Sequence, residues 1–411
     1  MTTTREPVSP RKPFAAEPLG GTVDERLARL PDVVAALRRD DPAAERDRVL
    51  QYDGVEAIRR TGVLELRVPT EFGGPGGKVR DVLSAVIQIG RGSSNVAQAL
   101  RSHFGFSERL LSNRATVSER AEWFPRVNDG IIVGNAITDA AGRAPSSADT
   151  KVLPDTDGIL RLNGYKFYST GTLFADVIAV SALDAQGRDI QAIIPADREG
   201  VELFDDWDGF GQRTTASGGT RFTDVEVHPH EVVTVSEGNT LGHATAFLQL
   251  YLAAVAVGIA YAVYDDAVEY VRTKARPASH SVADSAATDP FVLQTVGEIW
   301  ADATSAEAIA LSAADAIDRL VDEGSQHDPR ALAEVAVTVA RAQLVAERLT
   351  ISAAERLFDT GGASATARGL NLDRHWRNAR TIAGHSPLAY KAYAAGNYAV
   401  NGTVPPANGY F

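Results

Sequence analysis

The segment ATAFLQLYLAAVAVGIAYAVY, from Ala244 to Tyr264, decides how this chain folds. Its 21 residues carry no charged side chain, so the segment must leave water for either a membrane or a protein core. Gln249 lies inside the segment, and Asp265 and Asp266 follow it at once. No cluster of lysine and arginine flanks either end, as a membrane helix would usually show. These features favour a helix buried in a helical bundle, and no membrane association is expected.

Further helical segments follow this uncharged one. Residues Phe291–Val321 and Ala331–Phe358 repeat apolar side chains at three- and four-residue spacing, which is typical of amphipathic helices. Gly361-Gly362 is a suitable left-handed cap for the second of them. Long helices joined by short connections predict an up-and-down four-helix bundle over residues 234–411.

Two other patterns precede the bundle. Residues 23–133 have helical periodicity and predict an N-terminal helical domain, after a flexible polar arm at residues 1–22. Between residues 134 and 233 the period falls to two, which predicts a middle antiparallel β domain. Asn163-Gly164 lies between two apolar runs, so we expect a β-hairpin turn there. The fold class is therefore α+β, in the order helices, sheet, helices.

Composition excludes several classes of function. The 411 residues are 44% hydrophobic and 23% charged, a balance typical of globular proteins with two or three cooperating subdomains. A formal net charge of −12 repels phosphate backbones, so no nucleic-acid partner is expected. The chain has no cysteine, which excludes disulfides and thiolate catalysis and is compatible with the cytoplasm. The N-terminal arm lacks the apolar core of a signal peptide, so a cytoplasmic protein is expected.

Common catalytic motifs are absent, among them GxGxxG, GxxxxGK[ST], HExxH and GxSxG. His228-Pro229-His230 offers two metal ligands, but such a pair is more often solvated surface, and no metal is expected. Polar side chains gather instead in four stretches. These are GNAITDA (134–140), YKFYSTG (165–171), DDWDGFGQRTTASGG (205–219) and NLDRHWRNARTIAGHSPLAYK (371–391).

Two features of the polar residues leave alternatives open. Arg374, Arg377 and Arg380 share a helical face, and their anionic partners are either acidic residues of this chain or a ligand phosphate. His103 lies in the helical stretch 95–111, where it is either a hydrogen-bonded structural histidine or a functional one.

Taken in order, the four stretches resemble the flavin-dependent monooxygenases of the acyl-CoA dehydrogenase superfamily. The nearest branch is that of the sulfur-acquisition oxidoreductases and dibenzothiophene monooxygenase. VPTEFGG (68–74), KARP (274–277) and GNYAVNG (396–402) extend the resemblance over about residues 55–405. It implies the three-part fold of that superfamily, with an N-terminal helical domain, a middle β domain and a C-terminal four-helix bundle.

The resemblance implies a flavin between the β domain and the bundle. The resemblance favours reduced FMN over FAD. No nicotinamide site is visible in the chain, so a separate NAD(P)H-dependent flavin reductase is expected to supply the reduced flavin. O₂ is the co-substrate. Arg276 looks like the arginine that reaches the flavin phosphate of a neighbouring subunit, which implies an oligomer. The related family is typically tetrameric, so a homotetramer is expected. The residues expected to contact the cofactor are Asn135, Thr138, Phe167, Ser169, Ser217, Arg276, Trp376, Arg377 and Arg380.

An acyl-CoA dehydrogenase needs a carboxylate base, and this chain lacks one at both positions that the superfamily uses. No glutamate follows Glu355, and Gln249 to Tyr251 occupy the other position. The resemblance implies instead that a flavin C4a-hydroperoxide is held by His103, Ser169 and His385, which match catalytic positions of the dibenzothiophene monooxygenase branch. The side chains expected to line the substrate pocket are Phe106, Trp207, Phe210, Gln249 and Tyr251.

An organosulfur compound, as a sulfide, sulfoxide or sulfone, is the favoured substrate. N-hydroxylation of an amine and oxygenation of an aromatic ring stay open, because Ile382 and Ser386 replace a histidine and an aspartate of the related motif. Two rivals also remain. One is an acyl-CoA dehydrogenase or oxidase with a displaced base, and the other is a flavin-free binding or scaffold protein.

Overall fold

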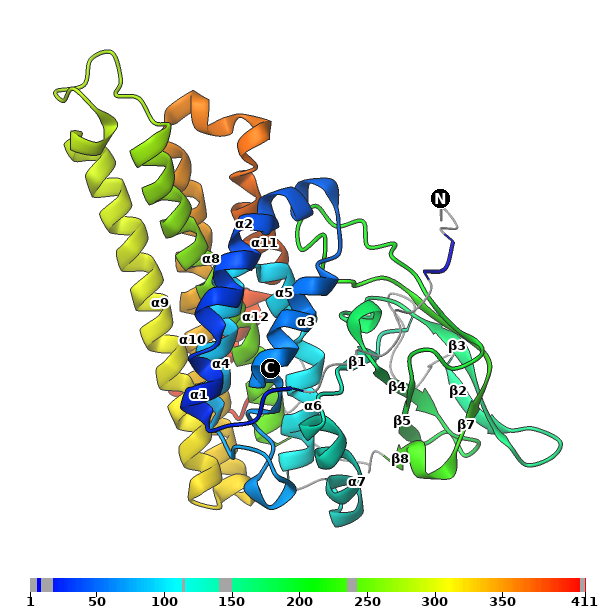
Figure 1. The fold of residues 1–411 in the computed structure, drawn as a ribbon. Coiled ribbons are helices and arrows are strands. Elements are labelled where there is room, and N and C mark those ends of the chain that lie inside the picture. The colour runs from blue at the N-terminus through cyan, green and yellow to red at the C-terminus, as the bar shows by residue number, and fades with distance from the viewer. Residues whose placement is uncertain (1–5, 9–17, 113–114, 140–149, 235–241, 407–410) are drawn as a thin grey trace.

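The protein has three parts, arranged as helices, a sheet and more helices (Figure 1). The computed structural model describes residues 6–8, 18–112, 115–139, 150–234, 242–406 and 411. Of the expected flexible arm, the described residue Val8 forms a β bridge with Leu203. The order of elements confirms the α+β architecture predicted from periodicity.

Seven described helices form the N-terminal part. They are α1 (Val23–Leu27), α2 (Leu30–Asp47), α3 (Tyr52–Thr61), α4 (Val79–Gly92), α5 (Ser94–Ala99), α6 (Arg101–Leu111) and α7 (Val117–Asn128). The expected continuous helix over 95–111 is interrupted at Leu100, between α5 and α6. Ser93 caps α5, because its side chain accepts a hydrogen bond from the amide of Val96.

The C-terminal part is built around α8 (His243–Thr273), which contains the uncharged segment. This helix is long and apolar enough to cross a membrane, but 89% of its most apolar 18-residue window is buried inside the fold. Helices α4, α9, α10 and α11 pack around it. A Cβ atom added to Gly258 would lie 2.7 Å from the backbone of Gly90, so α4 and α8 approach each other closely only because both positions are glycine.

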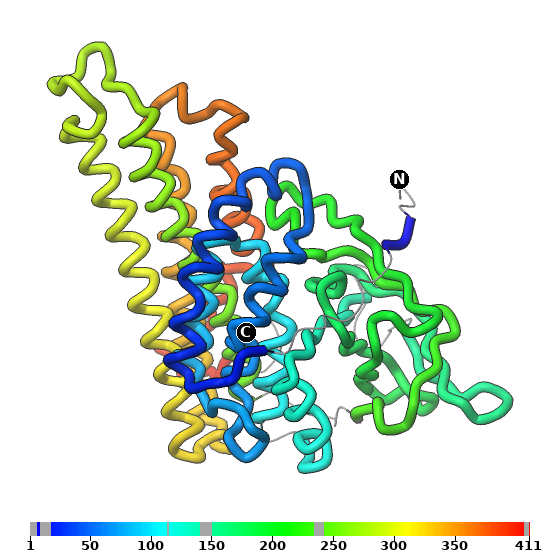
Figure 2. Tube along the Cα trace, in the orientation of Figure 1, coloured from blue at the N-terminus to red at the C-terminus, as the bar shows by residue number. Residues whose placement is uncertain are grey.

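Helices α9 (Pro290–Asp322) and α10 (Pro329–Arg356) run beside α8 in both views (Figures 1 and 2). The remaining C-terminal helices are short. They are α11 (Asp373–Ile382) and α12 (Leu388–Asn401), and both pack against α10. Over the described residues, the bundle therefore has three long helices, α8, α9 and α10, and two short helices, α11 and α12, in place of a fourth long one. The expected cap at Gly361-Gly362 is wrong, because α10 ends at Arg356. A 3-10 helix follows directly.

The middle part is one mixed sheet with eight described strands. They are β1 (Val133–Ala136), β2 (Lys151–Pro154), β3 (Leu160–Lys166), β4 (Val177–Leu183), β5 (Asp189–Pro195), β6 (Val201–Leu203), β7 (Thr220–Val227) and β8 (Val232–Thr234). Their order is β6-β7-β3-β2-β4-β5-β8, with β1 paired to β4. Most pairs are antiparallel as predicted, but β1 and β2 each pair with β4 in parallel.

The predicted hairpin turn at Asn163-Gly164 is wrong, because β3 continues through both residues. The pairing of β3 with β7 shifts between Leu162 and Gly164, which is a β-bulge. Gly164 has φ +153°, and a Cβ there would lie 2.4 Å from the hydroxyl of Thr150. The side chain of Asn163 accepts a hydrogen bond from the amide of Asp224, 2.8 Å away. Glycine is thus needed for close packing and not for a turn.

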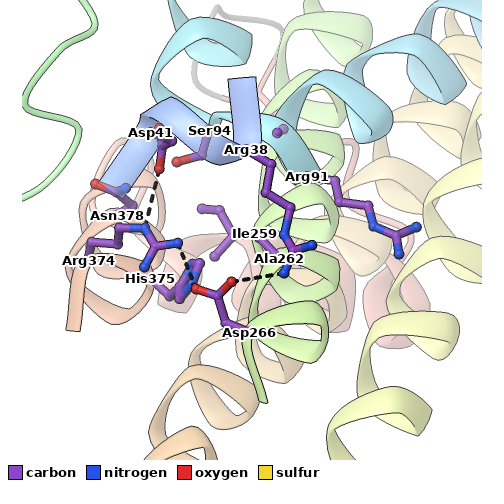
Figure 3. Close-up of a pocket in the computed structure, with 12 residues that line it drawn as sticks. Arg38, Asp41, Arg91, Ser94, Ile259, Ala262, Asp266, Arg374, His375 and Asn378 are labelled. Atoms are coloured by element: carbon purple, nitrogen blue, oxygen red, sulfur yellow. Dashed lines mark hydrogen bonds and ion pairs between the residues drawn. The ribbon is translucent and has the colours of Figure 1, made fainter. Parts of the chain in front are cut away.

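A buried ion-pair cluster joins α2, α8 and α11 (Figure 3). Asp266 on α8 accepts hydrogen bonds from Arg374 (2.7 Å) and His375 (2.8 Å) on α11, while Arg374 also faces Asp41 on α2 at 3.3 Å. Burial alone would raise the pKa of Asp266, but the contacts with His375 and Arg374 outweigh it and hold the pKa well below its usual range. The cavity between these groups measures only ≈ 10 Å³, room for about one water.

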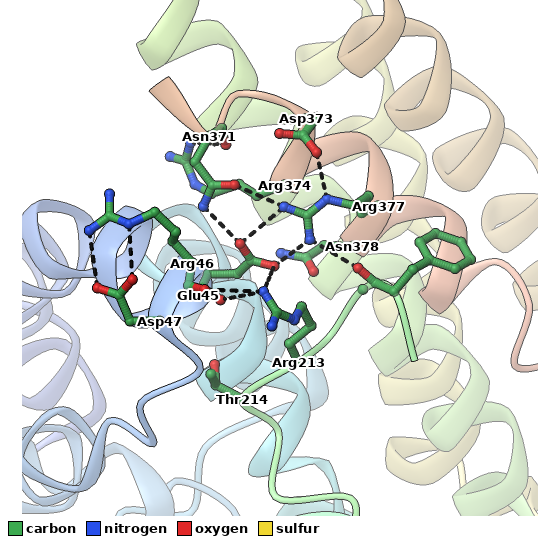
Figure 4. Close-up of polar contacts among 12 residues, drawn as sticks. Glu45, Arg46, Asp47, Arg213, Thr214, Asn371, Asp373, Arg374, Arg377 and Asn378 are labelled. Carbon is green, nitrogen blue, oxygen red and sulfur yellow. Dashed lines mark hydrogen bonds and ion pairs between the residues drawn. The ribbon is translucent and has the colours of Figure 1, made fainter. Parts of the chain in front are cut away.

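A second cluster surrounds Glu45 at the end of α2 (Figure 4). Its fully buried carboxylate accepts hydrogen bonds from Asn371 at 2.7 Å and from Arg377. Arg377 also donates to the carbonyl of Phe210 at 2.9 Å, so the cluster ties the loop before β7 to α11. Arg374 and Arg377 therefore have acidic partners within this chain, which was one of the two alternatives for the arginine face.

Asp266→Asn should destabilise the fold strongly, because Arg374 would keep a single carboxylate partner inside the protein. We expect a loss of about 3–5 kcal/mol in the free energy of unfolding, measured by chemical denaturation with tryptophan fluorescence. Asp322→Asn is the matched control, since its partner Lys78 and Asp322 itself are both more than half exposed. Equal midpoints for the two variants would contradict the structural role of the cluster.

Candidate active site

Segments from all three parts of the chain meet around the start of α6. Arg101 donates a hydrogen bond to the carbonyl of Leu248 on α8 at 3.1 Å. Ser102 donates to the carbonyl of Thr170, which follows β3, at 3.3 Å. The other end of the Arg101 guanidinium lies 3.4 Å from Nε2 of His385, in the turn between α11 and α12. The start of α6 therefore contacts α8, the chain after β3 and the turn between α11 and α12.

The loop between Asp205 and Gly219 is fastened to the same place by its hydroxyl groups. The Ser217 hydroxyl lies 2.8 Å from that of Thr170 and 2.7 Å from that of Thr215. The amide of Ser169 donates to the carbonyl of Gly218 at 2.8 Å. The loop and the end of β3 thus form one surface lined by small hydroxyl side chains.

The hydroxyl of Ser169 makes this surface a candidate ligand site. Its residue is fully buried, yet its hydroxyl has no hydrogen-bond partner within the part of the chain that the structure describes. Leaving such a group unsatisfied costs about 1–3 kcal/mol, so a ligand or an ordered water is expected there. Other buried atoms on α5 and the loop also lack described partners. They are Asn95 Nδ2, Gln98 Oε1, Gln212 Oε1 and Thr214 Oγ1.

Backbone strain gathers at the same loops. Tyr168, Gln212 and Ala216 have φ angles of 55°, 53° and 52°, in the left-handed region that side-chain-bearing residues seldom adopt. Strain of this kind costs roughly 1–3 kcal/mol per residue and is found disproportionately at functional sites. Half of the described non-glycine residues with positive φ therefore border the candidate site.

Aromatic rings form the rim. The rings of Tyr168 and Trp207 meet edge to face at 5.7 Å, and those of Phe210 and Trp376 stack at 6.0 Å. Phe210 and Tyr168 are more than half exposed. The structure thus places Trp207 and Phe210, predicted as pocket walls, and Trp376, predicted at the cofactor, on the outer edge of the site.

His385 is the imidazole that the structure brings into the site. Its Nδ1 lies 3.4 Å from the hydroxyl of Ser386, which donates to Gln249 Oε1 at 3.1 Å. Although the residue retains solvent exposure, the protein packed around its ring, together with the charges of Arg101 and Lys391, lowers the pKa of His385 to about 3. His385 is therefore neutral at physiological pH.

The predicted flavin-side residues of the sheet lie together. The amide of Phe167 donates to the carbonyl of Thr138 at 2.8 Å, which joins the end of β3 to the chain after β1. Asn135 lies on β1, half-buried, and Ser169 follows Phe167. Ala140, the last residue of the GNAITDA stretch, lies outside the described residues.

Three of the predicted cofactor residues are arginines, and the contacts of the described residues do not join them to one another. All three nitrogens of the Arg377 guanidinium donate to protein acceptors, so contact with a phosphate would require those bonds to be replaced. Arg380 is exposed on α11, and Arg276 is exposed in the chain after α8. The roles of these arginines at a flavin stay predictions.

His103 is enclosed in the fold. It is fully buried, its Nε2 lies 2.9 Å from the carbonyl of Leu64, and its Nδ1 accepts from the amide of Val133 at 3.4 Å. Burial lowers the pKa of His103 to about 4. Phe106 packs against Trp123 in a core cluster. This geometry favours the structural alternative for His103.

Tyr251 is also fully buried, with its hydroxyl donating to the carbonyl of Ala97 at 2.7 Å, so it supports α5 from behind. Sequence reasoning missed the polar face of α5, where Asn95 and Gln98 are three residues apart and point to one side. The signal was available, since two amides on one face of an otherwise apolar segment need partners.

Comparisons with known proteins identify the fold and the family. The sequence models of the acyl-CoA dehydrogenase N-terminal and C-terminal domains match residues 29–131 and 250–390. The probable FMNH2-dependent monooxygenase SfnC of Pseudomonas putida is 31% identical over 391 residues, covering 91% of this chain and 93% of that protein. Dibenzothiophene monooxygenase of Rhodococcus erythropolis is 30% identical over 380 residues, covering 88% and 90%.

Among solved structures, FMN-bound TdsC from Paenibacillus sp. A11-2 superposes with a TM-score of 0.86 at 30% identity, covering 94% of this chain and all of that one. The fold is that of an oxidoreductase of the acyl-CoA dehydrogenase type. More narrowly, the chain belongs to the flavin-dependent monooxygenases of the acyl-CoA dehydrogenase superfamily. The family predicted from the sequence motifs is confirmed.

The ring of His385 should remain neutral over the whole physiological range, because its pKa is lowered to about 3. Solid-state NMR of ¹⁵N-histidine-labelled protein should show no titration of its ring nitrogens between pH 8 and about pH 5, where an ordinary histidine, with pKa about 6.5, becomes protonated. The signal is assigned by its loss in His385→Gln. A midpoint above about pH 5.5 would refute the neutral assignment.

Proposed function

We propose that this protein is the oxygenase of a two-component system. It takes reduced FMN from a separate NAD(P)H-dependent flavin reductase and uses O₂ to oxygenate a small organosulfur substrate, as a sulfide, sulfoxide or sulfone. The observation that carries the proposal is the fully buried hydroxyl of Ser169, which has no partner among the described residues, in the chain segment that the start of α6 joins to the neutral His385. The names of SfnC, dibenzothiophene monooxygenase and FMN-bound TdsC support the cofactor and the substrate class.

The donor set fits a flavin. The hydroxyls of Ser169, Thr170 and Ser217, together with the backbone after β3, offer small neutral hydrogen-bonding groups suited to the polar edge of an isoalloxazine ring. When bound, reduced FMN supplies the electrons that activate O₂. Exposed Arg276, from a neighbouring subunit, and Arg380 are available for the phosphate.

The residues of the chain perform three tasks in this proposal. Ser169 and Thr170 orient the flavin edge, and the aromatic rim at Trp207 and Phe210 excludes water from the site. His385 contributes a neutral imidazole, which stabilises a reactive oxygen by hydrogen bonding. Because the ring is neutral, it adds no charge to the site. A carboxylate base for dehydrogenation is missing at the position of Gln249, whose Oε1 accepts from Ser386 and Lys391 at 3.1 and 3.2 Å.

An oligomer completes the proposed site. Tyr390, Tyr393 and Val400 lie on one face of α12 and are each exposed by more than two thirds. Such a strip is typical of a protein interface and supports the predicted homotetramer. Cytoplasmic location, beside the supply of reduced flavin, is part of the proposal.

Replacing His385 by alanine should remove the hydrogen bond that steadies the reactive oxygen. The test is rapid mixing of protein loaded with anaerobically reduced FMN against oxygenated buffer, followed by flavin absorbance. Wild-type protein should show a spectrally distinct transient before oxidised flavin. In His385→Ala its lifetime should fall by at least about tenfold, the kinetic equivalent of 1.4 kcal/mol.

The matched control is His327→Ala, which removes an exposed histidine between α9 and α10. It should behave as wild type. An unchanged lifetime and product yield in His385→Ala would remove His385 from the mechanism. Turnover of an acyl-CoA with an artificial electron acceptor would favour the dehydrogenase rival, while a folded protein that binds neither FMN nor FAD would favour the scaffold rival. If the transient is observed, product formation from a panel of sulfides, sulfones, amines and phenols then identifies which atom is oxygenated.

Replacing Arg276 by alanine should weaken FMN binding by about 10- to 100-fold, because a charge-assisted contact to phosphate contributes roughly 1.5–3 kcal/mol. Flavin fluorescence titration measures the dissociation constant. Arg272→Ala, four residues earlier and equally exposed, is the control and should bind FMN normally. The same dissociation constant in both variants would sink the phosphate assignment.

A further inference from the structure

A chain of polar side chains runs from the candidate site into the helical bundle. It begins at His385, whose Nδ1 lies 3.4 Å from the Ser386 hydroxyl. Ser386 donates to Oε1 of Gln249 at 3.1 Å, and Nζ of Lys391 donates to the same oxygen at 3.2 Å. Ser386, Gln249 and Lys391 are all almost completely buried. The proposed function uses only the first member of this chain.

The direction of each hydrogen bond follows from chemistry. A lysine ammonium can only donate, so the atom of Gln249 that faces Lys391 must be the amide oxygen and not the nitrogen. With that oxygen fixed as an acceptor, the Ser386 hydroxyl directs its hydrogen toward Gln249. Its lone pairs are then turned toward Nδ1 of His385, which must carry the ring proton.

The opposite side of the ring gives the same answer independently. Nη1 of Arg101 lies 3.4 Å from Nε2 of His385, and a guanidinium has no acceptor. Nε2 therefore presents its lone pair. Both contacts are long, but both require the same tautomer, with hydrogen on Nδ1 and a free pair on Nε2.

Lys391 is held as a buried cation by its surroundings. Its ammonium lies 4.7 Å from the centre of the Phe411 ring, a cation–π distance, and the carboxylate of Glu347 on α10 acts on it electrostatically. Burial lowers the pKa of Lys391 to about 8, while the charge of Glu347 opposes that shift. Gln343 donates to Glu347 at 2.9 Å and orients this carboxylate. The amide oxygen of Gln249 gives this buried ammonium a hydrogen-bond acceptor.

We propose that Lys391 is a positioning residue, which acts through Gln249 and Ser386 to hold His385 with its proton on Nδ1 and its lone pair on Nε2. The site then has an imidazole that accepts a hydrogen bond at the nitrogen facing Arg101. The use of that nitrogen at a flavin rests on the proposed function, but the tautomer itself does not, so it is measurable in protein without flavin.

The experiment is solid-state NMR of ¹⁵N-histidine-labelled, flavin-free protein, which separates the two neutral tautomers by the shifts of protonated and unprotonated ring nitrogens. The signal of His385 is again assigned by its loss in His385→Gln. Gln249→Met and Gln249→Glu form a matched pair of similar size, since methionine removes the acceptor oxygen and glutamate keeps one facing Lys391. Ser386→Ala removes the hydroxyl between Gln249 and His385. Lys391→Met removes the proposed positioning residue. Its control is Lys274→Met, which removes an exposed lysine after α8.

Wild-type protein, Gln249→Glu and Lys274→Met should show His385 protonated on Nδ1. In Gln249→Met, Ser386→Ala and Lys391→Met the ratio of the Nδ1 to the Nε2 tautomer should fall roughly two- to tenfold, the equivalent of one hydrogen bond. The proposal is overturned if Lys391→Met melts cooperatively and keeps the wild-type ratio, or if Gln249→Met and Ser386→Ala do so. Because flavin is absent, that failure would leave the monooxygenase proposal standing, and a failed oxygen assay would leave the tautomer result standing.

Discussion

Burial of one uncharged helix governs the architecture of this protein. Helix α8 must be covered along most of its length, and α4, α9, α10 and α11 do so. A polar group on such a helix has to find partners inside the protein. Gln249 near its start finds Ser386 and Lys391, and Asp266 further along finds Arg374 and His375. Gln249 and Asp266 therefore both contact the segment from α11 to α12, which carries His385.

The two ion-pair clusters determine where that segment lies. Asp266 and Asp41 hold Arg374, while Glu45 holds Arg377, so α11 is fixed against α2 and α8 at successive turns. Buried ion pairs contribute little net stability, but a broken pair is costly, which makes them effective at enforcing one arrangement. The turn after α11 then places His385 next to Arg101. Charges that resemble a phosphate site in the sequence thus act as the framework of the site.

The sequence was sufficient for the order of helices, sheet and helices, because hydrophobic period reports burial directly. It failed at Asn163-Gly164, where the packing of β2 and β7 overrides a local turn preference. The resemblance supplied Ser169, His385 and His103 as catalytic candidates, and their roles stay predictions. The buried amides of α5 lie in none of the stretches that carry the resemblance. Partners such as Glu45 and Arg377 are 332 residues apart, and only the folded chain could reveal them.

The same apolar helix also affects how the protein is made. As the chain leaves the ribosome, α4 is already present when α8 emerges, but α9 and α10 have still to be synthesised. For that interval a segment with the length and hydropathy of a membrane span lacks α9, α10 and α11, three of the four helices that cover it in the fold. Chaperones that bind nascent apolar segments therefore have a specific target in residues 244–264, and production in a host cell is expected to depend on them. Ribosome-bound chains from which residues 244–264 have emerged, but α9 has not, would test this dependence by their sensitivity to protease.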